Sequence, residues 1–169
     1  RTLRANECDL SAFTAMPDGV TGKTIRVTNY GREDQEHSLF LKLDNSRGGI
    51  SDTKKEQWEW LLNVFKKGVP QKNVFITFPL DFEKYEAGSI EAEILKKKIK
   101  EKLPDKNIFI ISYGAELKYD VRDGIRFITV SQFPEFSYEN AREIVNNLKY
   151  GLFTITDDDV YFEFKNIIQ

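Results

Sequence analysis

The chain has 169 residues, of which 40% are hydrophobic and 31% charged, and its formal net charge is −2 at pH 7. This composition excludes a disordered chain, and the balanced charge gives no basis for nucleic-acid binding. The apolar runs are too short for a membrane span, and the first residues lack the apolar segment of a signal peptide. A single cysteine, Cys8, excludes an internal disulfide and a thiolate metal cluster.

The sequence favours one domain with a core that contains β-strands. Thirteen Phe, seven Tyr and two Trp are typical of such a core. We find no internal repeat, low-complexity tract or linker, so we expect a single domain over residues 1–169, with residues 1–23 as a weakly structured lead-in. Because the chain begins with Arg1 rather than methionine, we also expect that it is excised from a larger protein.

Two strands are predicted first. Residues 23–31 alternate apolar and polar side chains, with Ile25 and Val27 on one face and Gly31 at the end. Residues 37–46 contain the second strand, in which Phe40 faces away from three leucines. These leucines are Leu39, Leu41 and Leu43. Because both faces of this strand are apolar, we expect both to be covered.

A helix is predicted after the polar loop 44–51. Thr53 and Glu56 have the spacing of a capping box, and Gly68 followed by Pro70 ends the pattern. The predicted buried stripe consists of Trp58, Leu61, Leu62 and Phe65. The apolar run 73–80 then indicates a strand buried in a parallel sheet.

A second helix is predicted from Ser89. Its expected buried stripe consists of Ile90, Ile94, Ile99 and Leu103. Glu91 and Glu93 lie in its first turns and five lysines lie between residues 96 and 102, a charge order that suits the helix dipole. The lysine cluster has two interpretations, a solvated helix face and a patch that binds anions or a membrane.

The remaining elements are a strand and two hairpins separated by a helix. The strand covers residues 107–112, and a hairpin turning at Asp123–Gly124 follows it. A helix is predicted from Ser137 to Gly151, and a closing hairpin turns over Asp157–Asp159. These three aspartates lack the spacing of a calcium-binding loop, so they are predicted to form a turn.

The order of these elements predicts an α/β (or α+β) fold. Strand–helix–strand connections imply a central mixed sheet with a parallel centre and helices packed on it. The C-terminal hairpins are expected to extend or cap this sheet.

The segment Gly114–Tyr119, GAELKY, follows the strand-like run NIFIIS. With four other segments in the same order, it resembles the C-terminal half of calcineurin-like metallophosphoesterases. FLKLDNSRGGISDTKKEQWEWLLNVF is similar to the family's strand, glycine loop and Gln-x-x-Trp-Leu helix. VFITFPLDF resembles its His-x-Pro strand, IISYGAELKY its Gly-His-x-His-x-Tyr strand end, VRDGIRFITV the next hairpin, and YGLFTITDDDVYFEF the closing strands. The resemblance covers residues 24–165, and the ligand motifs of the family's N-terminal half are absent.

The resemblance implies a degenerate site. Family metal ligands would fall on Thr77, Ala115 and Leu117, while Gly114 and Tyr119 keep the frame of the motif. A two-metal centre needs several imidazole and carboxylate donors, which these three residues lack. The single histidine, His37, precedes a different strand. The expectation is therefore a fold relative without metal or cofactor.

Three functions remain open. The first is a non-catalytic accessory module of a larger bacterial protein, which provides a scaffold or binds a ligand, a protein partner or an adjacent catalytic domain of the same polypeptide. The second is a phosphoesterase-type hydrolase that uses Asp44 and Asp81 with Tyr119, or that a missing N-terminal half completes. The third is a ligand-binding loop at residues 44–49, formed by Asp44, Asn45, Ser46 and Arg47 with glycine amides. Secretion or display at the cell surface is implied only by similar bacterial modular proteins.

Overall fold

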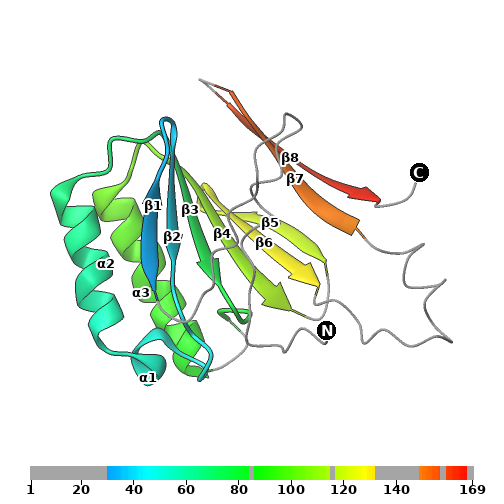
Figure 1. Ribbon diagram of the computed structural model, residues 1–169. Coiled ribbons are helices and arrows are strands. Elements are labelled where there is room, and N and C mark those ends of the chain that lie inside the picture. Colours follow the sequence, from blue (N-terminus) through cyan, green and yellow to red (C-terminus); the bar gives the residue numbers. More distant parts are fainter. Residues whose placement is uncertain (1–29, 84–85, 115–116, 132–148, 157–158, 167–169) are drawn as a thin grey trace, which may run out of the picture.

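The computed structural model describes residues 30–83, 86–114, 117–131, 149–156 and 159–166 (Figure 1). Several predictions fall on other residues. Outside the described ranges lie the lead-in, most of the strand predicted for 23–31, most of the helix predicted from Ser137, Ala115 and the first two aspartates of the closing turn.

A six-stranded sheet with helices on one face forms the centre of the protein. In chain order the elements are β1 (Gly31–Asp34), β2 (Ser38–Lys42), α1 (Ile50–Thr53), α2 (Glu56–Lys67), β3 (Asn73–Phe78), α3 (Glu86–Lys102), β4 (Asn107–Gly114), β5 (Lys118–Arg122), β6 (Ile125–Ser131), β7 (Lys149–Ile155) and β8 (Val160–Asn166). The strand order in the sheet is β1-β2-β3-β4-β6-β5, and β7 and β8 form a separate antiparallel pair.

The mixed sheet with a parallel centre is confirmed. Strands β2, β3, β4 and β6 run parallel, while β1 and β5 pair antiparallel at the two edges. The steps from β2 to β3 and from β3 to β4 advance in the same direction, so right-handed crossovers place α2 and α3 on the same face. Figure 1 shows both helices on that face and the β7–β8 hairpin on the other.

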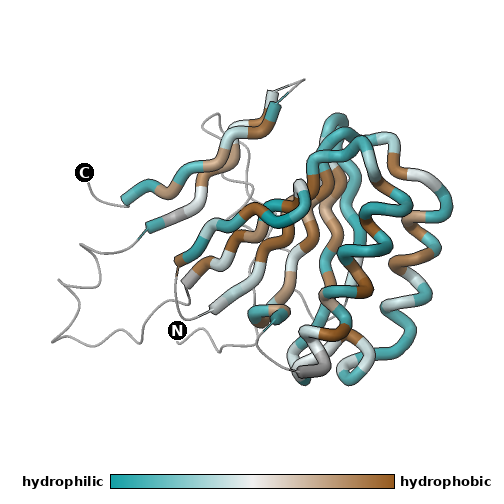
Figure 2. The backbone as a smooth tube through the Cα atoms, turned by 180° about the vertical axis from the view of Figure 1, so that it is seen from behind, coloured by the Kyte–Doolittle hydropathy of each residue, from teal (hydrophilic) through white to brown (hydrophobic). Residues whose placement is uncertain are grey.

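The face under the helices holds the larger apolar core. It combines the three leucines of β2 and the loop after it with Val74 and Ile76 of β3, Ile108 and Ile110 of β4, and side chains of both helices. Figure 2 shows hydrophobic residues along the central strands and a mixed pattern on the helices. The continuous buried run of β3 is the one expected for a central parallel strand.

The opposite face holds an aromatic core beneath the β7–β8 hairpin. Phe75 stacks between Phe40 and Phe109, with ring centroids 4.9 and 4.8 Å apart, and Phe153 of β7 meets Phe75 edge-on at 5.2 Å. The prediction that Phe40 faces away from the leucines of its strand is therefore confirmed. Of the two hairpins, β5–β6 extends the sheet and β7–β8 covers its second face.

The tight turns follow the sequence closely, apart from two glycines. Asp123 and Gly124 have φ angles of 54° and 80°, as the predicted two-residue hairpin turn requires, and Gly68 ends α2 with φ 85°. Gly31 was expected to end a strand but begins β1. Gly151 was expected to end a helix but lies within β7, where a Cβ would come 2.8 Å from Cε2 of Phe162.

The predicted helix faces are partly wrong. In α2 the buried residues are Gln57, Leu61, Val64 and Phe65, while Leu62 is exposed. In α3, Ile99 and Leu103 are buried as expected, the latter just past the last helical residue, but Ile90 and Ile94 are 60% and 46% exposed. The inward face of α3 instead carries Ala92, Leu95 and Ile99, because this stripe meets the leucines of β2 and the isoleucines of β4.

The predicted capping box is also wrong. Thr53 is the last residue of α1, and its hydroxyl donates to the carbonyl of Gly49 at 2.8 Å. Helix α2 begins with Lys55 as its N-cap, and no side chain caps it. The short helix α1 includes Thr53, which the sequence pattern assigns to the cap of the next helix, while Glu56 becomes the first residue of α2.

Candidate functional site

The loops that follow β2 and β3 lie side by side at the carboxyl ends of these strands, where the Asn45 side chain joins them. The Asn45 side chain is fully buried. Its Nδ2 donates to the carbonyl of Leu80 at 3.2 Å, and its Oδ1 accepts the amide of Leu80 at 3.1 Å. The oxygen and the nitrogen of the side-chain amide are thus both hydrogen-bonded to the backbone of Leu80. Asn45, a predicted ligand-binding residue, therefore connects two loops of the protein.

Replacing Asn45 with alanine is expected to lower the free energy of unfolding by about 1–2 kcal/mol, because the backbone groups of Leu80 lose their partners. The cost stays moderate because Leu80 is half-buried and water can replace part of the bridge. Urea denaturation followed by circular dichroism measures this difference. A midpoint unchanged from the unsubstituted protein would contradict the structural role of Asn45.

Asp44 is held in the same loop by its own backbone and side chain. Gln57 of α2, which is fully buried, accepts the Asp44 amide at 2.7 Å and donates to the Asp44 carbonyl at 2.8 Å. The Asp44 carboxylate accepts the amide of Ser46 at 3.0 Å, which is an Asx turn. This arrangement positions the loop, and it explains why Gln57 turns inward in place of an apolar residue.

Several backbone amides of the glycine loop already have acceptors within the protein. The amide of Gly48 donates to the carbonyl of Asn45 at 2.8 Å, and the exposed Arg47 donates its amide to the Thr53 hydroxyl at 3.1 Å. The amides of Ile50 and Ser51, at the start of α1, donate to the carboxylate of Glu91. The amides of Arg47, Gly48, Ile50 and Ser51 are therefore occupied by oxygen atoms of the protein, which leaves little support for an anion site in this loop.

Glu91 is the buried carboxylate that sequence reasoning missed. From α3 it accepts the amides of Ile50 and Ser51 and the indole Nε1–H of Trp58, the last two at 2.9 and 2.8 Å. Burial by itself would raise the pKa of Glu91, but these hydrogen bonds outweigh it and the pKa lies below its ordinary value. The sequence pattern treats Glu91 as a residue that merely complements the helix dipole.

The three positions at which the sequence resemblance predicts metal ligands differ in their surroundings. Thr77 is the second-last residue of β3 and is 8% exposed. Leu117 is half-buried immediately before β5, and Ala115 lies outside the described residues. The presence of glycine at position 114 has a structural explanation, because a Cβ there would lie 2.5 Å from Cγ2 of Thr129 on β6. Any larger residue at position 114 would therefore require Thr129 to move, so packing alone gives a reason for glycine at this strand end.

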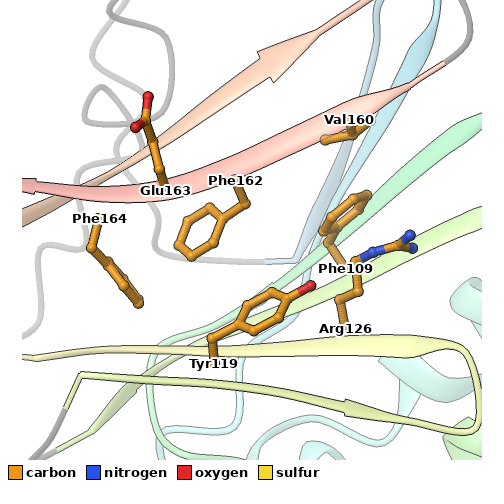
Figure 3. A pocket seen from close by; sticks show the side chains of 7 residues that line it. All are labelled: Phe109, Tyr119, Arg126, Val160, Phe162, Glu163 and Phe164. Atoms are coloured by element: carbon orange, nitrogen blue, oxygen red, sulfur yellow. The ribbon is translucent and has the colours of Figure 1, made fainter.

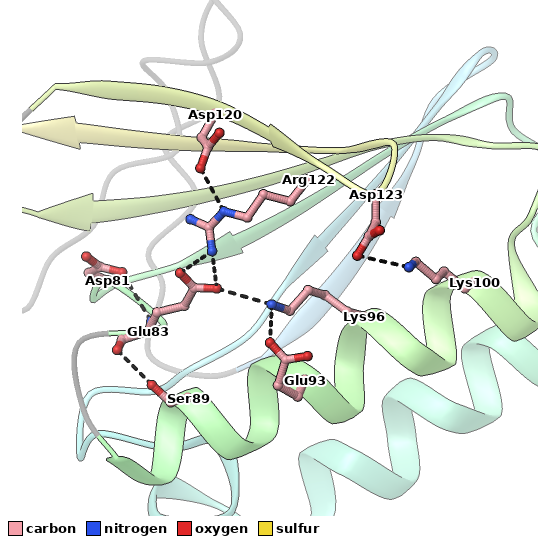
Figure 4. A network of polar contacts seen from close by, with 9 residues as sticks. All are labelled: Asp81, Glu83, Ser89, Glu93, Lys96, Lys100, Asp120, Arg122 and Asp123. Atoms are coloured by element: carbon pink, nitrogen blue, oxygen red, sulfur yellow. Dashed lines mark hydrogen bonds and ion pairs between the residues drawn. The ribbon is translucent and has the colours of Figure 1, made fainter.

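Asp81 lies beside a polar network on the helix face of the sheet (Figure 4). Its carboxylate accepts the amide of Glu83 at 3.1 Å. Arg122 of β5 binds both oxygens of Glu83 at 2.7 and 2.6 Å and also Asp120 at 2.7 Å, and Lys96 of α3 reaches Glu83 at 3.4 Å. Burial would raise the pKa of Glu83, but its cationic partners lower it below the ordinary value. The network joins the β5–β6 hairpin to the loop after β3 and to α3.

A small pocket of about 60 Å³ lies within this network. Its polar lining includes Asp81, Ser112, Lys118 and Asp120. Because Lys118 and Asp120 alternate with Tyr119 along β5, Tyr119 points to the opposite face of the sheet. The structure therefore does not bring Tyr119 together with Asp81, as a site that used both would require.

Tyr119 instead lines a larger pocket of about 300 Å³ between β8 and the sheet. Figure 3 shows its ring beside Phe162, with its hydroxyl directed toward Arg126. The Tyr119 and Phe162 rings are stacked with centroids 5.6 Å apart, and the Arg126 guanidinium lies 5.0 Å from the centre of the Phe109 ring. Val160, Glu163 and Phe164 of β8 complete the lining.

The lysine cluster on α3 is largely paired with carboxylates. Lys96 pairs with Glu83 and Glu93, Lys98 with Glu101 at 3.0 Å, and Lys100 with Asp123 at 3.0 Å. These pairs favour the interpretation as a solvated helix face over an anion-binding patch.

Three further findings bear on the class of protein. Among the residues that the structure describes, no three His, Cys, Asp or Glu side chains form a group that could hold a metal ion. None of the helices in these ranges has the length and apolar character needed to cross a membrane. No family model, curated protein or solved structure matches the chain.

Proposed function

We propose that the chain is a non-catalytic accessory module, similar to half of a metallophosphoesterase domain, within a larger bacterial protein. It provides a scaffold or binds a partner, either an adjacent catalytic domain of the same polypeptide or another protein. The observation that carries the proposal is that buried polar side chains join the loops at the carboxyl ends of β2 and β3. There the polar side chains Asn45 and Gln57 are fully buried and hold the loops together.

The surroundings of the former ligand positions support the same proposal. Thr77 is nearly buried and Leu117 is half-buried, and neither side chain offers an imidazole or carboxylate donor. Asp44 and Asp81 each accept a backbone amide two residues further along the chain. Such bonds are typical of carboxylates that shape loops.

The alternative is a hydrolase that uses Asp44 and Asp81 with Tyr119, or that a missing N-terminal half completes. Its first form has less support, because Asp81 and Tyr119 line pockets on opposite faces of the sheet. The observation in its favour is the pocket beside Asp81, which also contains Ser112, Lys118 and Asp120.

The test is metal analysis of the purified protein together with hydrolysis of bis(4-nitrophenyl) phosphate in the presence of Mn²⁺, Mg²⁺, Fe²⁺ or Zn²⁺. We expect no stoichiometric metal and a rate equal to that of an Asp44→Asn, Asp81→Asn double variant. The triple variant Thr77→His, Ala115→His, Leu117→His is also expected to remain inactive, since the motifs of the N-terminal half are absent. Ion-dependent turnover that disappears in the aspartate variant would overturn the proposal.

A further inference from the structure

The pocket under β8 combines aromatic walls with two polar groups, the Arg126 guanidinium and the Tyr119 hydroxyl, that have no polar partner among the described residues. Its walls are the rings of Phe109, Tyr119, Phe162 and Phe164. Within the described ranges, Arg126 makes no ion pair, and its recorded contact is the one with the Phe109 ring at 5.0 Å. The Tyr119 hydroxyl likewise has no hydrogen-bond partner among those residues, and Tyr119 is 45% exposed.

This arrangement differs from that of the other arginine on the same hairpin. Arg122, on the helix face, binds Glu83 through two hydrogen bonds and Asp120 through a third. Arg126 is half-buried on the opposite face without a carboxylate. A guanidinium in such a position favours an anion, preferably one that it can bind through two oxygens.

The charge of the pocket is set by Arg126. Glu163 belongs to the lining, but Figure 3 shows its carboxylate directed away from the rings, and it pairs with Lys165 at 3.0 Å. The remaining lining side chains are uncharged. As far as the described residues show, the pocket therefore presents one positive charge, that of Arg126, next to flat apolar surfaces.

We propose that this pocket binds a small aromatic carboxylate. The ring of the ligand lies among Tyr119, Phe162 and Phe164, and its carboxylate accepts hydrogen bonds from Arg126 and from the Tyr119 hydroxyl. Stacked and edge-on ring pairs of this kind already line the pocket, since Tyr119 stacks on Phe162 and Phe162 meets Phe164 at 82°. The inference goes beyond the proposed function and does not depend on it.

The size of the pocket limits the ligand to about one ring. Small-molecule sites begin at about 300 Å³, and an apolar cavity of about 150 Å³ accepts benzene. A pocket of about 300 Å³ therefore accommodates a single ring with a short acidic chain. For a ligand of this size we expect a dissociation constant of about 0.1–1 mM.

The experiment is a titration of the full chain with 3-phenylpropionate, followed by ¹H–¹⁵N NMR. We expect saturable shifts that include the Arg126 side-chain Nε–H and amides of β5, β6 and β8. The uncharged 3-phenylpropanamide should bind about tenfold more weakly, because it lacks the charge that Arg126 recognises. This comparison uses the unsubstituted protein and does not depend on the folding of any variant.

Arg126→Met keeps an unbranched side chain without the charge. It is expected to weaken the binding of 3-phenylpropionate about tenfold and to leave the affinity for 3-phenylpropanamide unchanged. Lys97→Gln is the matched control, since it removes one positive charge from the exposed surface of α3 and should leave the affinity unchanged. The proposal is overturned if 3-phenylpropionate gives no saturable shifts up to about 10 mM, well above the expected range. Equal affinities for the acid and the amide would also overturn it.

Discussion

Replacing Glu91 with alanine is expected to lower the free energy of unfolding by about 3–4 kcal/mol, since three donors lose a charged acceptor. These donors are the amides of Ile50 and Ser51 and the indole of Trp58. Ile50 is fully buried, so water does not readily replace the carboxylate there. Thermal and urea denaturation of the variant measure the difference.

The variant Glu91→Gln is the matched control, because it keeps one carbonyl acceptor and nearly the same shape. It should lose about half as much stability as the alanine variant. A similar stability for both variants and the unsubstituted protein would show that Glu91 does not hold α1 against α3.

The same carboxylate makes stability depend on pH in a defined direction. The pKa of Glu91 in the folded protein lies below its ordinary value of 4.5, so the unfolded chain binds its proton first as the pH falls. The stabilisation is therefore complete above pH 4.5 and is lost as the pH falls below it, through the folded pKa. The alanine variant should show a smaller loss of stability between pH 6 and pH 3 than the unsubstituted protein.

Replacing Gly88 with alanine is expected to lower the free energy of unfolding by about 2–3 kcal/mol, in spite of the higher helix propensity of alanine. A Cβ at this buried position of α3 would lie 2.3 Å from the carbonyl oxygen of Phe82 and 2.7 Å from that of Gly48. Both of these atoms belong to the backbone, so a change of side-chain rotamer cannot relieve the clash. The helix would have to move away from the loops after β2 and β3.

Gly31→Ala provides the comparison for this substitution. Nothing lies within 4 Å of a Cβ at Gly31, and its backbone does not need glycine. Its stability should stay within about 0.5 kcal/mol of the unsubstituted protein. Equal stabilities of the two glycine variants, measured by urea denaturation, would contradict the close approach at Gly88.

Sequence reasoning identified the sheet because its signals are local and redundant. The continuous apolar runs of β3 and β4 distinguish buried parallel strands, and Asp123–Gly124 specifies its turn through two positive φ angles. The pattern also locates α2 and α3, although α3 begins at Glu86 rather than Ser89 and its buried face differs from the predicted one. Its sequence offers two apolar stripes, and only packing against β2 and β4 selects Ala92, Leu95 and Ile99 over Ile90 and Ile94.

The candidate site was harder to predict because the same residue types serve structure and binding. Asn45 and Asp44 follow a buried strand, as ligand-binding residues often do, yet their partners are the backbone of Leu80 and Ser46. Those contacts depend on loop geometry that no sequence spacing specifies. Arg126 was missed for the converse reason: in the sequence it is one polar residue in an alternating hairpin strand, and only β8 encloses it.

The charged edge strands of the six-stranded sheet, β1 and β5, have a consequence for solubility. Both are short antiparallel strands, of four residues in β1 and five in β5, and both are rich in charged residues. The charged residues are Arg32, Glu33 and Asp34 at one end and Lys118, Asp120 and Arg122 at the other. A strand of a second molecule that added to either end would have to displace ion pairs such as Arg32–Asp34 and Arg122–Asp120. The sheet is thereby protected against the edge-to-edge aggregation to which its apolar central strands would otherwise be prone.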